Sequence, residues 1–408
     1  MNRVFFLTNH VCVGESGGGH GVEFRLYQAD KKYNLFDKEV IYIFGDRVIR
    51  GHEETGAIKE TKDMPKRSEF RLSLRKYIPS TFRLMKMKKM YNGIEEYLNN
   101  VDEIYHFSED DVYIFHDVKM AKAFLSKYSF SKCALVYHKQ GSIYNEWHAD
   151  TGLNSNIMKK YYNDMFEFIV SKVKFLCFPS KGSEESLVAS APELKTAVNK
   201  VSRKYLYNGV FCPEIKQSEL SPWIKEIQKF DGLKMVTVAN LNEAKAVERI
   251  PEYIYNLKKA GLKVKWILVG NGVKATEVEK NIKDYNIEEN VIWKKGNVMH
   301  SELMQVFSVT DFYILFHKYS IFDLSTLEAM HYGNIPVLTP VGGNKEMIFE
   351  NSGLFVSDFG NVESFISYIN NNSLEELHDL NRKIKRENFD EKAFLTRYVD
   401  LIAEMQGK

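Results

Sequence analysis

The sequence is poor in the features that mark several common classes of protein. Only four cysteines occur among 408 residues, and no two form a C-x-x-C pair. We therefore predict reduced thiols in apolar surroundings rather than disulfides or a zinc site. The sequence also lacks a D-x-D motif, so we expect no metal ion, and no other cofactor is indicated. No apolar run approaches the roughly 18 residues of a membrane-spanning helix.

The charge balance has no excess of either sign. Lys and Arg together number 56, and Asp and Glu together number 54, so the overall charge gives no indication of nucleic-acid binding. The apolar run within the first ten residues is too short for a signal peptide. We therefore expect a cytoplasmic protein without a nucleic-acid partner.

What the sequence does contain is typical of a large globular protein. A length of 408 residues, 44% of them hydrophobic, exceeds what one ordinary core organises, so two domains are predicted. Aromatic residues make up 13% of the chain, which suits the stacking of sugars and equally suits ordinary cores.

One stretch, Phe316–Glu346, combines a loop, a helix start, a strand and a glycine turn. Asp323 is placed as an N-cap residue before the helical run LSTLEAMHY, and Gly333 as its C-terminal stop. The apolar IPVLT then predicts a buried strand, and VGGNKE predicts a turn whose glycines admit a close ligand. In an open α/β sheet ligands bind at such strand ends, and a helix N-terminus suits a phosphate.

Glu328 lies in the first turns of this predicted helix. A carboxylate does not bind phosphate, but it accepts hydrogen bonds from sugar hydroxyl groups. The alternative is an ordinary αβ unit of a nucleotide-binding sheet, in which Glu328 is a solvated helix charge. From the pattern alone, both interpretations remain open.

The same stretch resembles the donor-binding segment of retaining glycosyltransferases of the GT-B fold, family 4 type, also called glycosyl transferases group 1. That segment runs E-G-F-G-x-x-x-L-E-A-M-A-x-G-x-P-V and is followed by a G-G-x-x-E turn. Three positions depart from it, because Ser320 replaces the first Glu while Ile321 and Asp323 replace two glycines. The positions that match in register are Leu327, Glu328, Ala329, Met330, Gly333, Pro336, Val337, Gly342, Gly343 and Glu346.

The region before this stretch resembles the same family. The run Asn240–Lys245, after a predicted strand at Met235–Ala239, resembles an R-L-x-x-x-K loop with Asn240 in place of the Arg. A Lys at this place suits a diphosphate, and a plain surface lysine is the alternative. Two further predicted strands, Lys265–Val269 and Val291–Trp293, are followed by Gly270-Asn271-Gly272 and Gly296-Asn297-Val298, which correspond to loops that in the family lie around the nucleotide.

The first half opens with a predicted strand, Val4–Thr8, then a glycine-rich loop, Gly14–Gly21, and a helix. This order is typical of a Rossmann-like half, although a simple tight turn would use the same glycines. The resemblance implies that this loop lies near the donor phosphate and the acceptor. It supplies Gly18 and Gly19 as donor-binding candidates, and His20 and Glu23 as acceptor candidates.

His138 follows the predicted strand Cys133–Tyr137. In the family that it resembles, a His after the corresponding strand lies near the transferred sugar, whereas the alternative is a core or capping histidine. Trp147, a little further on, is a candidate for the acceptor side. Other strands are predicted at Glu39–Phe44, Ile104–Phe107, Val112–Phe115 and Phe175–Pro179.

We therefore predict an α/β protein of the GT-B type, with two Rossmann-like, doubly wound domains facing across a cleft. Residues 1–211 would form the acceptor-binding domain and residues 212–385 the nucleotide-sugar-binding domain. Residues 386–408, with a helix at Glu387–Met405, would cross back and pack on the first domain.

The function that the resemblance implies is transfer of a hexosyl or N-acetylhexosaminyl group, with retention and without a metal. The donor would be a nucleotide sugar, by default a UDP-sugar, and the acceptor a glycan, a lipid-linked glycan or a protein, as in surface polysaccharide assembly. The implied catalytic residues are His138, Lys245 and Glu328. The implied donor-binding residues are Gly18, Gly19, Asn240, Gly270, Asn271, Val298, Ser320, Leu324, Ser325, Thr326, Glu328, Gly342, Gly343, Asn344 and Glu346.

The departures at Asn240 and Ser320 are both losses from the donor site, and they leave an alternative open. The chain could be a catalytically silent GT-B subunit that recognises an acceptor or stabilises a partner glycosyltransferase.

One segment, residues 59–90, is rich in basic residues with apolar residues interleaved. Such a pattern is typical of a peripheral element on an anionic membrane surface, here the inner face of the membrane. The alternative is a solvated helical hairpin whose apolar face packs on its own domain. An RNA-binding role has no stacking motif to support it.

Overall fold

The structure is a computed structural model that describes residues 2–12, 21–51, 53–57, 80–216, 220–296 and 298–407. Three of the candidate residues (Gly18, Gly19 and His20) and the part of the basic segment before residue 80 therefore lie outside the described residues. The chain forms two compact units. Unit 1 comprises Met1–Tyr207 with Phe394–Lys408, and unit 2 comprises Asn208–Ala393.

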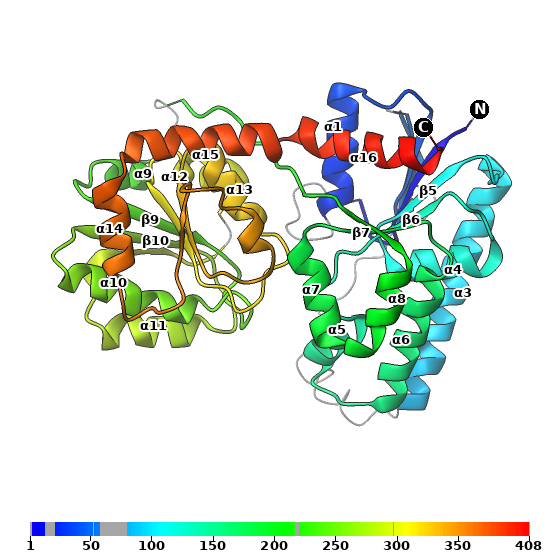
Figure 1. Ribbon diagram of the computed structural model, residues 1–408, viewed down its shortest axis with the longest axis horizontal. Coiled ribbons are helices and arrows are strands. Elements are labelled where there is room, and N and C mark those ends of the chain that lie inside the picture. The colour runs from blue at the N-terminus through cyan, green and yellow to red at the C-terminus, as the bar shows by residue number, and fades with distance from the viewer. Residues whose placement is uncertain are drawn as a thin grey trace. The chain divides into compact units, whose positions relative to one another are not determined.

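Unit 1 is built on an eight-stranded sheet with helices on both faces (Figure 1). Its strand order is β4-β3-β2-β1-β5-β6-β7-β8, and only β3 runs antiparallel to the rest. The strands are β1 Val4–Leu7, β2 Val40–Ile43, β3 Arg47–Arg50, β4 Glu53–Ala57, β5 Val112–Phe115, β6 Cys133–Val136, β7 Phe175–Phe178 and β8 Ser202–Tyr205. The helices are α1 Val22–Tyr33, α3 Ser80–Tyr105, α4 Val118–Lys127, α5 Ile143–Thr151, α6 Asn156–Val170, α7 Lys181–Ser190, α8 Lys195–Lys200 and most of α16 Glu391–Met405.

Alternate residues of each central strand face opposite sides of this sheet. In β1, Phe5 and Leu7 pack with α3, α4 and α6, while Val4 and Phe6 pack with α1 and α16. Both faces of the parallel strands are therefore covered, which is why these strands read as continuous apolar runs. The C-terminal helix α16 crosses back to unit 1, as the sequence predicted.

One predicted strand, Ile104–Phe107, is wrong. Ile104 belongs to the last turn of helix α3, and the chain leaves the helix at His106, whose φ is +51°. The reason is a helical ladder of buried residues upstream, at Tyr91, Ile94, Leu98 and Val101, which continues the helix to its end.

Unit 2 contains a six-stranded, fully parallel sheet with the order β11-β10-β9-β12-β13-β14. The strands are β9 Leu233–Val238, β10 Val264–Val269, β11 Val291–Lys294, β12 Phe312–Leu315, β13 Ile335–Leu338 and β14 Leu354–Phe355. The helices are α9 Pro222–Gln228, α10 Ile250–Lys259, α11 Ala275–Asp284, α12 His300–Phe307, α13 Leu324–His331, α14 Glu363–Asn371 and α15 Leu374–Asn388, with short 3-10 turns that include η5 Val247–Arg249 and η7 Gly342–Glu346.

The predicted helix at Glu387–Met405 is in fact two helices. Helix α15 ends at Asn388 and α16 begins at Glu391. Phe389 leaves the helical conformation and packs with its ring against Phe322, at a centroid distance of 5.5 Å. Asp390 then accepts a hydrogen bond from the amide of Ala393, which caps the next helix.

Each sheet has one topological switch point, where successive connections leave in opposite directions. In unit 1 it lies between β1 and β5, and in unit 2 between β9 and β12. The carboxyl ends of the strands at such a point leave a crevice in which ligands bind in open α/β sheets. Both places carry clusters of polar side chains.

Among the described residues, no helix has the length and the apolar character needed to cross a bilayer. In helix α3, Leu84, Met87 and Met90 pack against the core of unit 1, while Phe82 and Met85 are exposed. The described end of the basic segment is thus in part an ordinary core-facing helix.

Candidate functional site

Three side chains meet at the switch point of unit 2. Lys245 comes from the loop after β9, His317 from the end of β12, and Asp323 from the residue before α13. The Lys245 ammonium forms an ion pair with the Asp323 carboxylate, and its Nζ lies 3.1 Å from Nε2 of His317. The sequence had proposed Lys245 as a phosphate ligand, and the structure shows it already paired.

Asp323 is buried and receives hydrogen bonds from several directions. The amide and the hydroxyl of Thr326 donate to its Oδ2 at 3.1 and 2.9 Å, and the Tyr313 hydroxyl donates to the same oxygen at 3.0 Å. Burial alone would raise the pKa of Asp323, but the charge of Lys245 and a hydrogen bond from His317 outweigh it and hold this pKa well below its usual range. Asp323 therefore caps the helix as predicted and stays ionised.

His317 connects this cluster to the glycine turn. The side-chain amide of Asn344 donates to the carbonyl of Thr339 at 2.9 Å and faces Nδ1 of His317 at 3.3 Å. Nε2 of the same ring lies between the Lys245 ammonium, at 3.1 Å, and the Asp323 carboxylate, at 3.6 Å. Burial and the charge of Lys245 lower the pKa of His317. The cluster thus holds one positive and one negative charge beside a neutral imidazole.

Glu328 is buried on α13, one turn after the cap. Its Oε1 lies 3.2 Å from Nε2 of His300, the first residue of α12. The carboxylate is therefore an oriented group and not the solvated helix charge of the alternative interpretation. Leu324, Ser325 and Thr326 form the first turn of the same helix, although the amide of Thr326 is already bound to Asp323.

The turn Gly342–Glu346 packs closely against the loop that precedes α13. Gly342 has a φ of +47°, and a Cβ at this position would lie 2.0 Å from the carbonyl oxygen of Ser320, so only glycine fits. The amide of Gly343 donates to that oxygen at 3.0 Å, and the amide of Asn344 donates to Val341 at 3.1 Å. These two amides, which the sequence analysis left for the donor sugar, are therefore engaged within the protein.

The remaining donor-binding candidates of unit 2 lie at the edges of this region. Gly270 approaches the carbonyl of Ala239 so closely that a Cβ would lie 1.9 Å from it. Asn240 and Asn271 are exposed. Val298 follows β11, and Glu346 ends the glycine turn, both partly buried.

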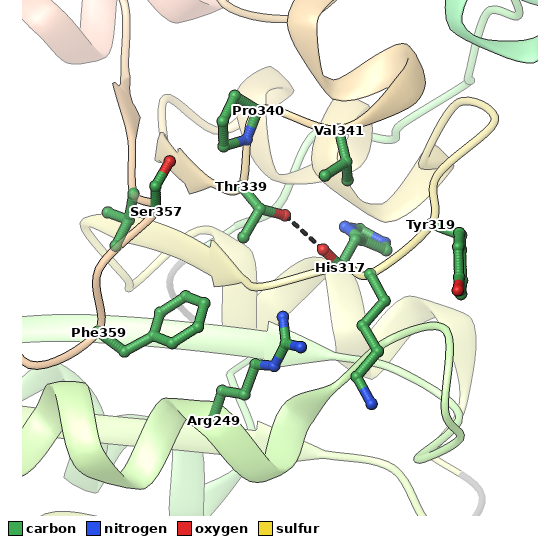
Figure 2. A pocket seen from close by; sticks show the side chains of 10 residues that line it. Arg249, His317, Tyr319, Thr339, Pro340, Val341, Ser357 and Phe359 are labelled. Atoms are coloured by element: carbon green, nitrogen blue, oxygen red, sulfur yellow. Dashed lines mark hydrogen bonds between the residues drawn. The ribbon is translucent and has the colours of Figure 1, made fainter. Parts of the chain in front are cut away.

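A pocket of about 580 Å³ opens beside His317 at the ends of β12 and β13 (Figure 2). Figure 2 shows the hydroxyl of Thr339 donating to the carbonyl of His317, at 2.7 Å. Arg249 reaches in from η5 with its guanidinium 5.3 Å from the ring centre of Phe359. Lys318 lines the same pocket and forms ion pairs with Glu243 and Glu248. Its size and its cationic lining suit a polar ligand.

The switch point of unit 1 holds a different cluster. Glu23 lies in the first turn of α1, His116 directly follows β5, and His138 lies two residues after β6. His116 Nδ1 lies 3.0 Å from His138 Nε2 and 3.9 Å from Glu23 Oε1. Burial and the neighbouring histidines His138 and His10 hold the pKa of His116 well below its usual range, so this ring is neutral.

Of the three predicted site residues of unit 1 that the structure describes, Glu23 and His138 lie together, and the third, Trp147, lies elsewhere in the unit. Trp147 lies on α5, where it stacks on Tyr144 at 5.6 Å and packs near Tyr162 at 6.3 Å. These contacts are those of a residue that packs against the core.

The sequence analysis missed His10, His116, His300 and His317 as members of polar clusters. His10, His116 and His317 follow buried strands within a few residues. That position is the available signal, since it was the one used to select His138. Which of these histidines share a site depends on strand order, which the local sequence does not encode.

The chain shares its fold with solved structures and part of its sequence with a known family. Residues 223–394, most of unit 2, match the model of the family described as Glycosyl transferases group 1. No match was found among curated proteins.

Three solved structures illustrate the shared fold. The sucrose-phosphate synthase from Thermosynechococcus elongatus has a TM-score of 0.67 at 14% identity, covering 100% of this chain and 99% of its own. A glycosyltransferase from Rickettsia africae ESF-5 has a TM-score of 0.63 at 14% identity, with coverages of 99% and 98%. HepE from Anabaena, solved with UDP and glucose, has a TM-score of 0.62 at 13% identity, with coverages of 99% and 100%. The chain therefore has the GT-B glycosyltransferase fold, with a Rossmann-like sheet in each unit.

Proposed function

We propose that the chain is a glycosyltransferase that binds a nucleotide diphosphate sugar at the switch point of unit 2. The observation that carries this proposal is the placement of Glu328, a buried and oriented carboxylate one turn into a helix whose N-terminus lies at the ends of β9 and β12. A carboxylate at this depth accepts hydrogen bonds from ribose hydroxyls, while the helix start lies within reach of the phosphates.

The chemistry is departure of a nucleotide diphosphate from an anomeric carbon. The reaction needs stabilisation of the negative charge that develops on the leaving phosphate. The amides of Leu324 and Ser325 at the start of α13, together with the Lys245 ammonium, would supply it without a metal at this site. Lys245 is 27% exposed and so accessible to a phosphate oxygen.

The nucleotide is proposed to be UDP and the transferred group a hexosyl or N-acetylhexosaminyl group, with retention at the anomeric carbon. Support comes from the resemblance to family 4 and from solved structures of the same fold, such as HepE with UDP and glucose and a pneumococcal O-GlcNAc transferase with UDP and GlcNAc. Ser320 occupies the position at which the family pattern has a carboxylate. As a neutral group it forms a weaker hydrogen bond with a sugar hydroxyl. The sugar is therefore the part of the donor most open to variation.

The direct experiment measures release of nucleotide diphosphate from a panel of UDP- and GDP-sugars, together with the thermal shift that each free nucleotide produces. We expect Glu328→Ala and Lys245→Ala each to weaken nucleotide binding at least about tenfold, because each removes a charged contact worth about 1.5–3 kcal/mol. Lys280→Ala and Glu288→Gln change exposed residues of unit 2 and serve as matched controls. Normal binding and turnover by the Glu328 and Lys245 variants would overturn the proposal.

The second candidate is the silent subunit, and one observation favours it. Lys245 is paired with Asp323, a residue that replaces a glycine of the family pattern, so its charge is already compensated. If no nucleotide of the panel shifts the unfolding temperature and no diphosphate is released, this second function takes the place of the first.

The proposed acceptor is a glycan, a lipid-linked glycan or a protein, and we propose a cytoplasmic enzyme that acts peripherally at an anionic membrane. Exposed Phe82 and Met85 on α3 support this surface. Phe82→Glu should reduce co-sedimentation with phosphatidylglycerol vesicles, whereas Ile157→Glu, on an exposed apolar residue of α6, should not. Equal loss in both variants, or no sedimentation of the wild type, would remove the membrane from the proposal.

A further inference from the structure

The polar cluster of unit 1 contains His138 and Glu23, which the family resemblance places near the transferred sugar and the acceptor, but the nucleotide site proposed for unit 2 does not use them. Glu23, His116 and His138 each offer one ligand atom, and these three atoms all lie within 4.8 Å of one another. They come from α1 and from the ends of two adjacent parallel strands, β5 and β6. The crevice at a sheet switch point therefore gathers one carboxylate and two imidazoles.

The Glu23 carboxylate is the second, independent observation. The residue is only 2% exposed, and among the residues that the structure describes neither of its oxygens has a hydrogen-bond partner. Two histidine rings lie at ion-pair distance from it without forming a hydrogen bond, His10 at 3.5 Å and His116 at 3.9 Å. A buried carboxylate without donors costs several kcal/mol, so native proteins compensate such a group by pairing it or by coordinating a metal.

We propose that Glu23, His116 and His138 bind one divalent transition-metal ion, for which Zn²⁺ is the probe. Two imidazoles and one carboxylate are a ligand set that such ions accept, and it leaves a coordination position open to water. This proposal concerns unit 1 alone, and it does not rest on nucleotide-sugar binding by unit 2.

The distances between the ligand atoms fit the proposed ion. Zinc–nitrogen bonds of about 2.0–2.1 Å at tetrahedral angles separate two ligand atoms by about 3.3 Å. The His116–His138 separation of 3.0 Å and the His116–Glu23 separation of 3.9 Å lie on either side of that value. All three ligand atoms, including those of Glu23 and His138, lie within 4.8 Å of one another.

The residues around the proposed metal site leave part of it exposed to solvent. His10 lies beside Glu23, and its Nε2 lies 3.7 Å from Asp117, whose Oδ1 caps helix α4. His10 is 21% exposed and His138 is partly buried, so an ion can enter from solvent. The sequence analysis expected no metal because the chain lacks a D-x-D motif and a C-x-x-C pair. These three ligands lie far apart along the chain, and the strand order of the folded sheet brings them together.

The test is a titration of the full chain, stripped of metal by a chelator, with Zn²⁺ followed by calorimetry in the absence of nucleotides. We expect one ion per chain. Glu23→Gln and His138→Gln should each weaken binding at least about tenfold, since even residues that only support metal ligands cost about 10- to 100-fold when changed. Co²⁺ should give visible absorption bands in the wild type that both variants lose.

The controls separate this site from other zinc-binding groups. His106→Asn removes an exposed histidine of the same unit, and Cys12→Ser removes the partly exposed thiol, and both variants should bind Zn²⁺ as the wild type does. If circular dichroism shows that Glu23→Gln disturbs folding, the test relies on His138→Gln, because His138 is only partly buried. Absence of binding by the wild type, unchanged binding by Glu23→Gln or His138→Gln, or loss in Cys12→Ser would each overturn the proposal.

Discussion

The two units place a buried carboxylate and a buried histidine at the same point of their sheets, yet they treat the carboxylate in opposite ways. Asp323 in unit 2 accepts hydrogen bonds from Thr326 and Tyr313 and is paired with Lys245. Glu23 in unit 1 receives no hydrogen bond on either oxygen from the part of the chain that the structure describes. The fold alone therefore does not determine whether a switch point is complete or is prepared for a ligand.

The two carboxylates differ in which groups offset the free-energy cost of burying them. The cost of burying Asp323 is met within the protein, so this residue holds the loop before α13 in one conformation whether or not a donor is bound. Glu23 has two histidine rings at 3.5 and 3.9 Å but no hydrogen bond from any described residue, so a cation would gain most there. A cluster whose buried carboxylate receives hydrogen bonds is a structural element, and a cluster whose buried carboxylate receives none is a candidate ligand site.

The largest expected effect is a loss of stability when the cluster around Asp323 is changed. Asp323→Asn keeps the shape of the side chain and its helix-capping oxygen but removes the charge that pairs with Lys245. We expect the free energy of unfolding of unit 2 to fall by about 3 kcal/mol, near the lower end for breaking a buried ion pair because Lys245 retains some contact with water. Urea unfolding followed by tryptophan fluorescence measures it, since three of the four tryptophans lie in unit 2.

The matched control is Asp379→Asn, which breaks an exposed pair with Arg382 in the same unit. Exposed pairs contribute about 0–1 kcal/mol, so this change should be small. Similar losses in the two variants would mean that Asp323 is no more important than a surface carboxylate, and the contrast between the two clusters would disappear.

The second prediction is a gain in stability where the first was a loss. In metal-free protein at pH 8, Glu23→Gln replaces a buried carboxyl group that no described residue hydrogen-bonds by a neutral amide, so unit 1 should gain about 1–2 kcal/mol of stability. Hydrogen exchange of the amides in β5 and β6 measures it locally, as slower exchange in the variant.

Saturating Zn²⁺ should reverse this order, because only the wild type can gain stability by binding the ion. A loss of stability in metal-free Glu23→Gln comparable to that of Asp323→Asn would show that Glu23 is satisfied within the protein after all.

The sequence carried most of the fold because its main features are local. The apolar runs of β6, β10 and β13, the cap at Asp323 and the stop at Gly333 depend on neighbours in the chain, and the structure contains them. The false strand at residues 104–107 was a short apolar run whose helical context lay upstream, beyond the window that was considered.

The candidate sites were only partly predictable for a different reason. Glu328 and Lys245 could be selected by their motif, but the partners that decide their chemistry, His300 and Asp323, are brought to them by packing. The grouping of Glu23 with His116 and His138 depends on β1, β5 and β6 being neighbours in space, which periodicity along the chain does not reveal.

The third prediction uses pH to sharpen the contrast at Asp323. The folded-state pKa of this carboxyl is held well below that of an unfolded Asp, near 3.9, so the unfolded state takes up the proton first as the pH falls. The stability that ionised Asp323 provides is therefore fully present above about pH 5. Below about pH 4 the wild type should lose it at about 1.4 kcal/mol per pH unit.

The corresponding measurement is the difference in unfolding free energy between the wild type and Asp323→Asn across this range. The difference should be constant from pH 8 to pH 5 and shrink below pH 4, because the variant has no carboxyl at this position. A difference that stays constant down to pH 3 would contradict a depressed pKa.

The smallest expected effect concerns an intermediate case, the Glu328 carboxylate with its partner His300. Because one hydrogen bond orients this carboxylate, His300 acts on nucleotide binding as a positioning residue and not by contact. On the proposed function, His300→Ala should weaken UDP binding about fivefold, corresponding to about 1 kcal/mol for one such hydrogen bond. His300→Gln keeps a donor near Glu328 and should restore most of the affinity. Calorimetric titration of UDP separates the outcomes. Equal weakening in both variants would mean that His300 acts through packing. Unchanged affinity in both would mean that the orientation of Glu328 does not depend on His300.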